Sequence, residues 1–116
     1  MTMFNARHER VANQLRQEIA TIIHRELKDA RLGFVTITKV ELSRDGSHAK
    51  VGFSCLGGAP ERERSQEALD HAAGFVRGLL ARRLRLKIIP EVMFRFDESI
   101  AQAIAMDAKL DQLNNA

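Results

Sequence analysis

The chain has 116 residues, 45% of them hydrophobic and 28% charged, which is typical of one globular domain of ordinary size. No apolar run approaches the roughly 18 residues that a membrane-spanning helix needs, and residues 1–10 lack the apolar core of a secretory signal. We therefore expect a single domain over residues 1–116, in the cytoplasm and without membrane contact, and the lone Cys55 excludes an internal disulfide.

The first third of the chain predicts a helix followed by a strand. Residues 7–27 carry apolar side chains three and four positions apart, the pattern of a helix with one buried stripe. Residues 34–42 are rich in β-branched side chains, which favour a strand. The apolar phase slips midway, so either a bulge lies near Thr38 or the first half of the strand is covered on both faces.

A turn and a second strand follow. Ser43-Arg44-Asp45-Gly46 has the residue types of a turn, and residues 49–55 then alternate strictly between apolar and polar or small side chains. This pattern predicts a β-hairpin. Cys55 continues the inward face of the second strand, so we interpret it as a small buried hydrophobe and not as a nucleophile.

The second half of the chain returns to helical spacing over residues 61–86. Gly74 interrupts that run, and a glycine weakens a helix by roughly 1 kcal/mol relative to alanine, so we expect two helices that meet at a kink. Pro90 opens a third strand, and a capping-box pattern at Ser99 predicts a terminal helix. The expected fold is α+β with the order α-β-β-α-α-β and a C-terminal helical segment.

Positive charge is concentrated in residues 72–96, which carry six Lys or Arg and one acid, a net charge of +5, whereas the rest of the chain carries −2. A solvated helix face is the ordinary explanation of a charge run. Here almost no acid is interleaved, so we favour a surface that meets phosphates, which arginine binds bidentately. Arg83 falls on the apolar arc of the helix, so either the helix ends before it or its side chain runs along the core edge into water.

The sequence gives little support for a metal site or for catalysis. The four histidines are far apart, and with a single cysteine they give no metal-ligand spacing. Asp97 and Glu98 are conceivable as the acid pair of a small hydrolase, but helix capping is the more ordinary role of such residues. We expect no enzymatic activity, no cofactor, no metal and no small-molecule substrate.

The predicted order is similar to the type II KH fold, but the glycine-x-x-glycine loop between the two middle helices is missing. Ala72-Ala73-Gly74 stands at that place. Together with four further segments, this substitution makes the chain resemble the ribosome-binding factor A family, bacterial assembly factors of the small ribosomal subunit, over roughly residues 7–105. The segments are Arg10-Val11-Ala12, residues 28–33, residues 40–45 with 49–51, and residues 85–97.

The resemblance implies binding to the free small (30S) ribosomal subunit and its 16S rRNA, as a monomer when bound. It also implies a role in late processing of the 16S precursor, importance in the cold, and no catalysis. One departure is that Ala30 stands where the family usually has proline, so the turn after the first helix is expected to be less fixed.

Without a glycine loop, we expect side chains to hold the RNA. Backbone and shape recognition of folded RNA fits better than base reading, because the chain has no Trp or Tyr. The candidate RNA-binding residues are Arg77, Arg82, Arg85 and Lys87, with Arg83 as a further candidate and Arg7 and Arg10 as a second site. The alternatives are a generic KH-like RNA-binding module and a protein adaptor that docks through an exposed apolar patch.

Overall fold

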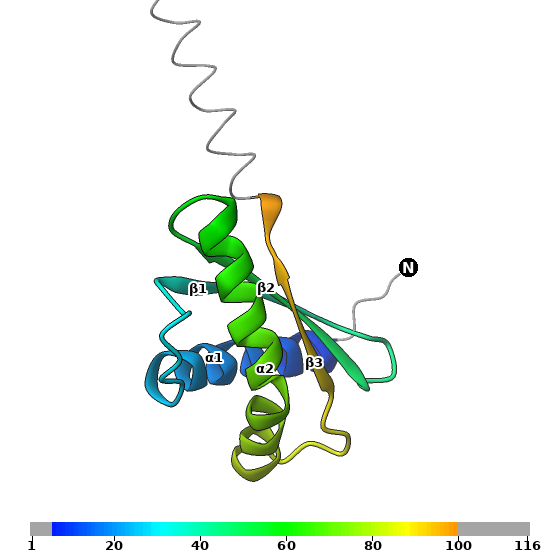
Figure 1. Ribbon diagram of the computed structural model, residues 1–116. Helices are drawn as coiled ribbons and strands as arrows, with labels where there is room; N and C mark the ends of the chain where they lie inside the picture. Colours follow the sequence, from blue (N-terminus) through cyan, green and yellow to red (C-terminus); the bar gives the residue numbers. More distant parts are fainter. Residues whose placement is uncertain (1–5, 100–116) are drawn as a thin grey trace, which may run out of the picture.

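A computed structural model describes residues 6–99 of the chain. Its elements follow in the order α1 (Ala6–Arg25), β1 (Val35–Leu42), β2 (His48–Cys55), α2 (Ala59–Arg83) and β3 (Glu91–Phe96) (Figure 1). The predicted α+β class is confirmed, while the helix expected from Ser99 falls outside the described residues. Within residues 6–99, neither helix combines the length and apolarity that crossing a lipid bilayer requires.

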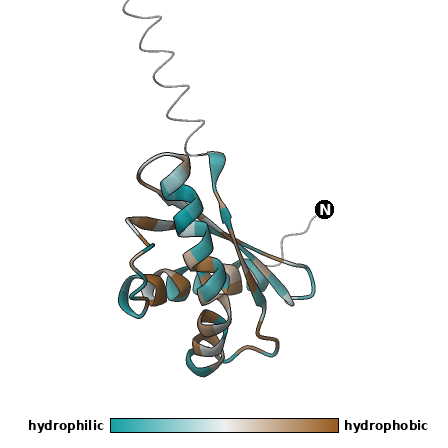
Figure 2. Cartoon of the chain, in the orientation of Figure 1, coloured by the Kyte–Doolittle hydropathy of each residue, from teal (hydrophilic) through white to brown (hydrophobic). Residues whose placement is uncertain are grey.

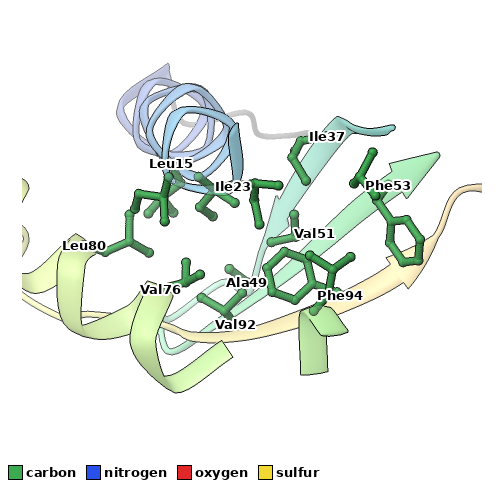
Figure 3. Close-up of a cluster of buried hydrophobic side chains, with 14 residues drawn as sticks. Leu15, Ile23, Ile37, Ala49, Val51, Phe53, Val76, Leu80, Val92 and Phe94 are labelled. Carbon is green, nitrogen blue, oxygen red and sulfur yellow. The ribbon is translucent and has the colours of Figure 1, made fainter. Parts of the chain in front are cut away.

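The first helix forms where its apolar stripe predicts it. Leu15, Ile19 and Ile22 are fully buried, and their spacing of four and three places them on one side of α1. That side packs mainly against β1. Figure 3 shows Leu15 and Ile23 pointing from α1 into the same cluster as the strand side chains.

The three strands form one mixed sheet in the order β1-β2-β3. The first two strands are antiparallel, and β3 runs parallel to β2. The pairing of β1 with β2 shifts its register between Ile37 and Val40. Of the two explanations for the slipped apolar phase, the structure therefore has the bulge.

Both helices cover the same face of the sheet. Phe53 and Phe94 are fully buried at the centre of the core, with side chains from α1 and α2 packed around them (Figure 3). The opposite face of the sheet exposes alternate residues such as Lys50, Met93 and Arg95. Cys55 is half-buried against the core edge, in keeping with the packing role predicted for it.

The second helix corrects one prediction. α2 is a single helix of 25 residues, so the division into two helices at Gly74 is wrong and the order is α-β-β-α-β. Ala68 and Leu69 before the glycine, and Val76 and Leu80 after it, are all buried in the helix interface. Both halves of α2 pack on the same sheet, and this packing outweighs the cost of about 1 kcal/mol that a glycine brings to a helix.

Candidate nucleic-acid interface

The five cations predicted between Arg77 and Lys87 lie in the last two turns of α2 and in the loop that leads to β3. Leu84 and Leu86 are half-buried against the core, whereas Arg85 and Lys87 between and after them are exposed. Figure 2 shows this loop as mostly hydrophobic, with short hydrophilic stretches. The apolar residues therefore anchor the loop and turn its cations toward solvent.

Two of these five cations, Arg77 and Arg83, form polar contacts within the protein. The Arg77 guanidinium donates a hydrogen bond of 2.9 Å to the carbonyl oxygen of Ile89. Arg83 forms ion pairs with Glu18 at 3.2 Å and Glu26 at 2.9 Å, both from the α1 side of the molecule. The hydrogen bonds to Glu26 and Glu18 raise the pKa of Arg83.

These contacts give the two arginines a structural role. Arg83 is the last residue of α2 and reaches past the core edge to α1, with its side chain 31% exposed. The helix therefore does not end before Arg83, as the first alternative had it, and the guanidinium pairs with two glutamates where the second alternative expected water. Arg77 fastens the end of the loop before β3. Together they hold in place the segment that carries the remaining cations.

Arg82, Arg85 and Lys87 are exposed. Within residues 6–99 none of the three makes a hydrogen bond or an ion pair. Their side chains are therefore open to solvent, and their role in RNA binding stays a prediction.

The sheet register brings the hairpin turn next to this loop. His48 at the start of β2 pairs with Glu91 at the start of β3. The backbone N–H of Glu91 also donates to the carbonyl oxygen of Ser47 at 2.9 Å. The turn before β2 and the basic loop before β3 consequently lie at the same end of the sheet.

The hairpin turn itself is fixed by an aspartate. The Asp45 carboxylate accepts hydrogen bonds from the Ser47 hydroxyl at 2.7 Å, the Ser47 N–H at 3.0 Å and the Ser43 hydroxyl at 2.9 Å. These bonds, the Ser47 hydroxyl first, lower the pKa of Asp45 to about 2. Gly46 adopts φ +80°, which suits glycine in a tight turn. Arg44 is presented at the tip of this turn.

The beginning of α1 joins the same end of the sheet. The His8 ring nitrogen Nε2 lies 3.0 Å from the carbonyl oxygen of Leu42, the last residue of β1. This contact places Arg7 and Arg10, one turn of helix apart, beside the hairpin turn.

The three segments line one groove of about 480 Å³. Its charged lining residues are Arg7, Arg10, Arg44, Asp45, Arg85 and Lys87. The structure thus merges the two sites predicted from the sequence, because Arg7 and Arg10 share a groove with Arg85 and Lys87. Arg82 does not line this groove, although it is exposed on the neighbouring turn of α2. We call this surface the basic groove.

Sequence reasoning missed Arg44. The sequence predicts a turn at this residue, which is confirmed, but gives it no functional role. Only the parallel pairing of β2 with β3 brings that turn to the basic loop, and strand pairing over such a distance leaves no local pattern in the sequence.

A second, smaller groove of about 310 Å³ contains both Asp97 and Glu98. Asp97 is already engaged, because it accepts hydrogen bonds from the Ser99 hydroxyl and from the Thr38 hydroxyl at 2.7 Å. These bonds lower the pKa of Asp97, the one from Ser99 most. A carboxylate held ionised in this way suits turn and strand fixation better than general acid catalysis. Across residues 6–99, no three His, Cys, Asp or Glu side chains gather as a metal site.

Comparison with known proteins agrees with the resemblance noted in the sequence. The family model described as ribosome-binding factor A matches residues 7–110. The chain belongs to the ribosome-binding factor A family. A family member from Staphylococcus epidermidis is 44% identical over 112 residues, which is 97% of each chain. One from Nitrosomonas eutropha is 43% identical over 103 residues, 89% of this chain and 88% of the relative.

Solved structures of ribosome-binding factor A share the fold. The solution structure of a Thermotoga maritima protein described as a putative ribosome binding factor A has a TM-score of 0.71 and 36% identity, covering 81% of this chain and 91% of the other. The Thermus thermophilus crystal structure has a TM-score of 0.70 and 30% identity, covering 77% and 93%. A homology model of the Thermus thermophilus protein, fitted into a cryo-EM map of a 30S complex, has a TM-score of 0.63 and 31% identity, covering 75% and 91%.

The turn that contains Ala30, expected from the resemblance to be less fixed, is held by side-chain hydrogen bonds. The Asp29 carboxylate accepts hydrogen bonds from the Arg31 N–H at 2.9 Å and from its guanidinium at 2.8 Å. The Leu32 N–H closes a turn on the carbonyl oxygen of Asp29 at 3.0 Å. Side-chain bonding thus fixes a turn that proline would otherwise restrict.

The segment Ala72-Ala73-Gly74 lies within α2. Ala72 and Ala73 are half-buried against the core, and Gly74 is exposed with nothing within 4 Å of where a Cβ would stand. The surroundings therefore leave room for a larger residue at Gly74.

Proposed function

We propose that this family member binds the free small (30S) ribosomal subunit and assists maturation of its 16S rRNA precursor. The observation that carries the proposal is the basic groove, where cations from three segments converge in a chain of the ribosome-binding factor A family. A relative whose model was fitted into the map of a 30S complex supports the same partner. We infer action in the cytoplasm, with particular importance in the cold.

The contact with 16S rRNA is proposed to rest on side chains. Arg82, Arg85 and Lys87 would hold phosphates, because they are exposed and make no polar contact within residues 6–99. Arg77 and Arg83, which bind Ile89 and two glutamates, would position the loop without touching RNA. Of the five cations predicted between Arg77 and Lys87, three therefore remain as proposed phosphate-binding residues.

We further infer a variant of the type II KH fold, in which Ala72-Ala73-Gly74 replaces the glycine loop. One residue of that segment is glycine, so a close approach of backbone to phosphate has little room there. We also propose that the protein acts without catalysis, cofactor or small-molecule substrate, and that it binds as a monomer. The engaged state of Asp97 supports the non-catalytic assignment.

The test is co-sedimentation of the purified protein with small subunits, intact ribosomes and naked 16S rRNA at matched concentrations. We expect selective pelleting with free small subunits. Equal pelleting with all three would favour a generic KH-like RNA-binding module, and no pelleting with small subunits would refute the proposal.

A protein adaptor is the second candidate, and one observation favours it. Phe34 and Leu56 are 80% and 72% exposed, and they are adjacent, since the Leu56 N–H faces the Phe34 carbonyl oxygen at 3.4 Å. An adaptor that docks through this pair would bind its partner with weak salt dependence. Replacing both residues with serine would then abolish small-subunit binding, whereas the RNA-based proposal expects little change.

A further inference from the structure

Two large apolar side chains are exposed at the end of the sheet where β1 begins and β2 ends. Phe34 is 80% exposed and Leu56 is 72% exposed. Their backbones are adjacent, since the Leu56 N–H faces the Phe34 carbonyl oxygen at 3.4 Å, and Figure 2 shows the beginning of β1 as hydrophobic. We call these two residues the apolar pair.

The two segments that carry the apolar pair are free of charge. Residues 32–38 and residues 51–60 contain no Asp, Glu, Lys or Arg. The basic groove lies at the opposite end of the strands and is lined by cations. A charged group placed against the apolar pair would lose hydration without gaining an opposite charge. The surface therefore suits an apolar, uncharged occupant.

The chain supplies such a segment at this end of the sheet. β3 runs parallel to β2 with Phe96 opposite Phe53, and the Asp97 N–H donates to the Phe53 carbonyl oxygen at 2.7 Å. The end of β3 therefore lies beside the chain that continues from Phe53 to Leu56 (Figure 1). Residues 99–106, Ser-Ile-Ala-Gln-Ala-Ile-Ala-Met, follow directly and carry no charge.

Asp97 fixes the point from which this segment starts. Its carboxylate accepts hydrogen bonds from the Thr38 hydroxyl at 2.7 Å, from the Ser99 N–H at 3.0 Å and from the Ser99 hydroxyl. Thr38 belongs to β1, so the bond passes over β2 at Gly52, where a Cβ would stand 2.6 Å from the Thr38 hydroxyl oxygen. The chain after β3 is thus tied to β1, the strand that begins next to Phe34.

We propose that residues 100–106 of the same chain bind over Phe34 and Leu56 and shield them from water. Burial of apolar surface drives the contact, with Ile100 and Ile104 as the largest aliphatic contributions. Neighbouring strands are about 4.8 Å apart, so a few residues of chain reach from the end of β3 to the apolar pair. The inference goes beyond the proposed function and does not rest on it.

The competing occupants are a second copy of the chain and an apolar segment of another protein. Either one must give up its translational and rotational freedom to bind. A segment joined to the surface by a short stretch of chain has already lost most of that freedom and faces its site at a high effective concentration. Attachment at the same end of the sheet therefore favours residues 100–106.

The test is tryptophan fluorescence of the full chain, which has no Trp of its own. Phe34→Trp keeps an aromatic side chain in the apolar pair, and Met93→Trp is the control at an exposed position of the same sheet. We expect Phe34→Trp to emit at shorter wavelength and to be quenched less by acrylamide than the control. Adding Ile100→Ser with Ile104→Ser should abolish both differences, whereas adding Asp107→Asn should preserve them.

Without a cover, the more exposed position 34 would be quenched more strongly than position 93, and that result overturns the inference. A blue shift that persists in the double serine variant also overturns it. A shift that disappears on dilution assigns the surface to a second copy, and one that appears only when small subunits are added assigns it to a ribosomal partner; both refute the proposal. Melting temperatures establish that the variants are folded. Failure of the proposed function appears separately, as absent co-sedimentation with small subunits.

Discussion

Neighbouring arginines at the end of α2 should respond in opposite ways to the same substitution. Arg82 and Arg85 are exposed and make no polar contact within residues 6–99. Arg83, between them, is paired with Glu18 and Glu26. We predict that Arg82→Gln with Arg85→Gln weakens small-subunit binding at unchanged melting temperature. Arg83→Gln should lower the melting temperature and leave the salt dependence of binding unchanged.

The magnitude follows from counterion release. Each phosphate contact contributes about −0.7 to −0.9 to the slope of log K against log salt concentration, so the double variant should lose about 1.4 to 1.8 of that slope. The electrostatic contribution vanishes toward about 1 M salt, so the same loss corresponds to about 15- to 30-fold weaker binding near 0.15 M. For the parent, three phosphates held by Arg82, Arg85 and Lys87 give a slope of about −2 to −3.

The assay is co-sedimentation with small subunits at four or more salt concentrations, with the bound fraction quantified at each. Thermal unfolding followed by circular dichroism reports stability of the same preparations. Arg25→Gln serves as the control for a lost exposed charge elsewhere, and it should change neither quantity.

Two results would refute this reasoning. If the double variant keeps the slope of the parent, Arg82 and Arg85 do not hold phosphates. If instead it unfolds at a clearly lower temperature, these residues have a structural role that their exposed positions do not reveal. A reduced slope in Arg83→Gln would show that its ion pairs open when RNA binds.

Further predictions concern stability. Gly52→Ala should destabilise the fold by about 1–3 kcal/mol in urea unfolding, because the new Cβ would stand 2.6 Å from the Thr38 hydroxyl oxygen. Gly74→Ala should instead stabilise it by about 1 kcal/mol, and weaker subunit binding by that variant would support a functional bend. Ala30→Pro, inside a closed turn, should stabilise by about 0.4–1 kcal/mol. Because the pKa of Asp45 is lowered to about 2 from an ordinary 3.8, its ionised form favours the folded state; stability should fall from pH 4 to pH 2, less steeply in Asp45→Asn.

The fold was predictable where burial is periodic in the sequence. The apolar stripe that includes Leu15 and Ile19 predicts both ends of α1 to within two residues. The alternation through Val51 and Phe53 predicts β2. Side-chain phase alone does not reveal strand pairing, so the sequence is compatible both with the bulge and with a strand covered on two faces. Gly74 does not divide α2, because the core contacts that hold both halves of the helix are tertiary and leave no trace in local propensity.

The candidate site was predictable as a charge excess but not as a geometry. Charge counting cannot tell that Arg83 is paired and Arg85 is not, because the partners of Arg83 are 57 and 65 residues away in the chain. Arg77 likewise depends on a carbonyl oxygen of the following loop. Which cations remain open to RNA is therefore decided by tertiary contacts.

The direction of β3 explains why distant cations converge. A strand parallel to β2 must start where β2 starts, so α2 returns the chain along the sheet to the hairpin end. The loop with Arg85 and Lys87 therefore arrives beside Arg44, and the contact of His8 with Leu42 brings α1 to the same end. An antiparallel β3 would place the basic loop at the opposite end of β2. The basic groove is thus a consequence of topology, and substitutions that leave every cation in place but loosen the β2–β3 register should still weaken RNA binding.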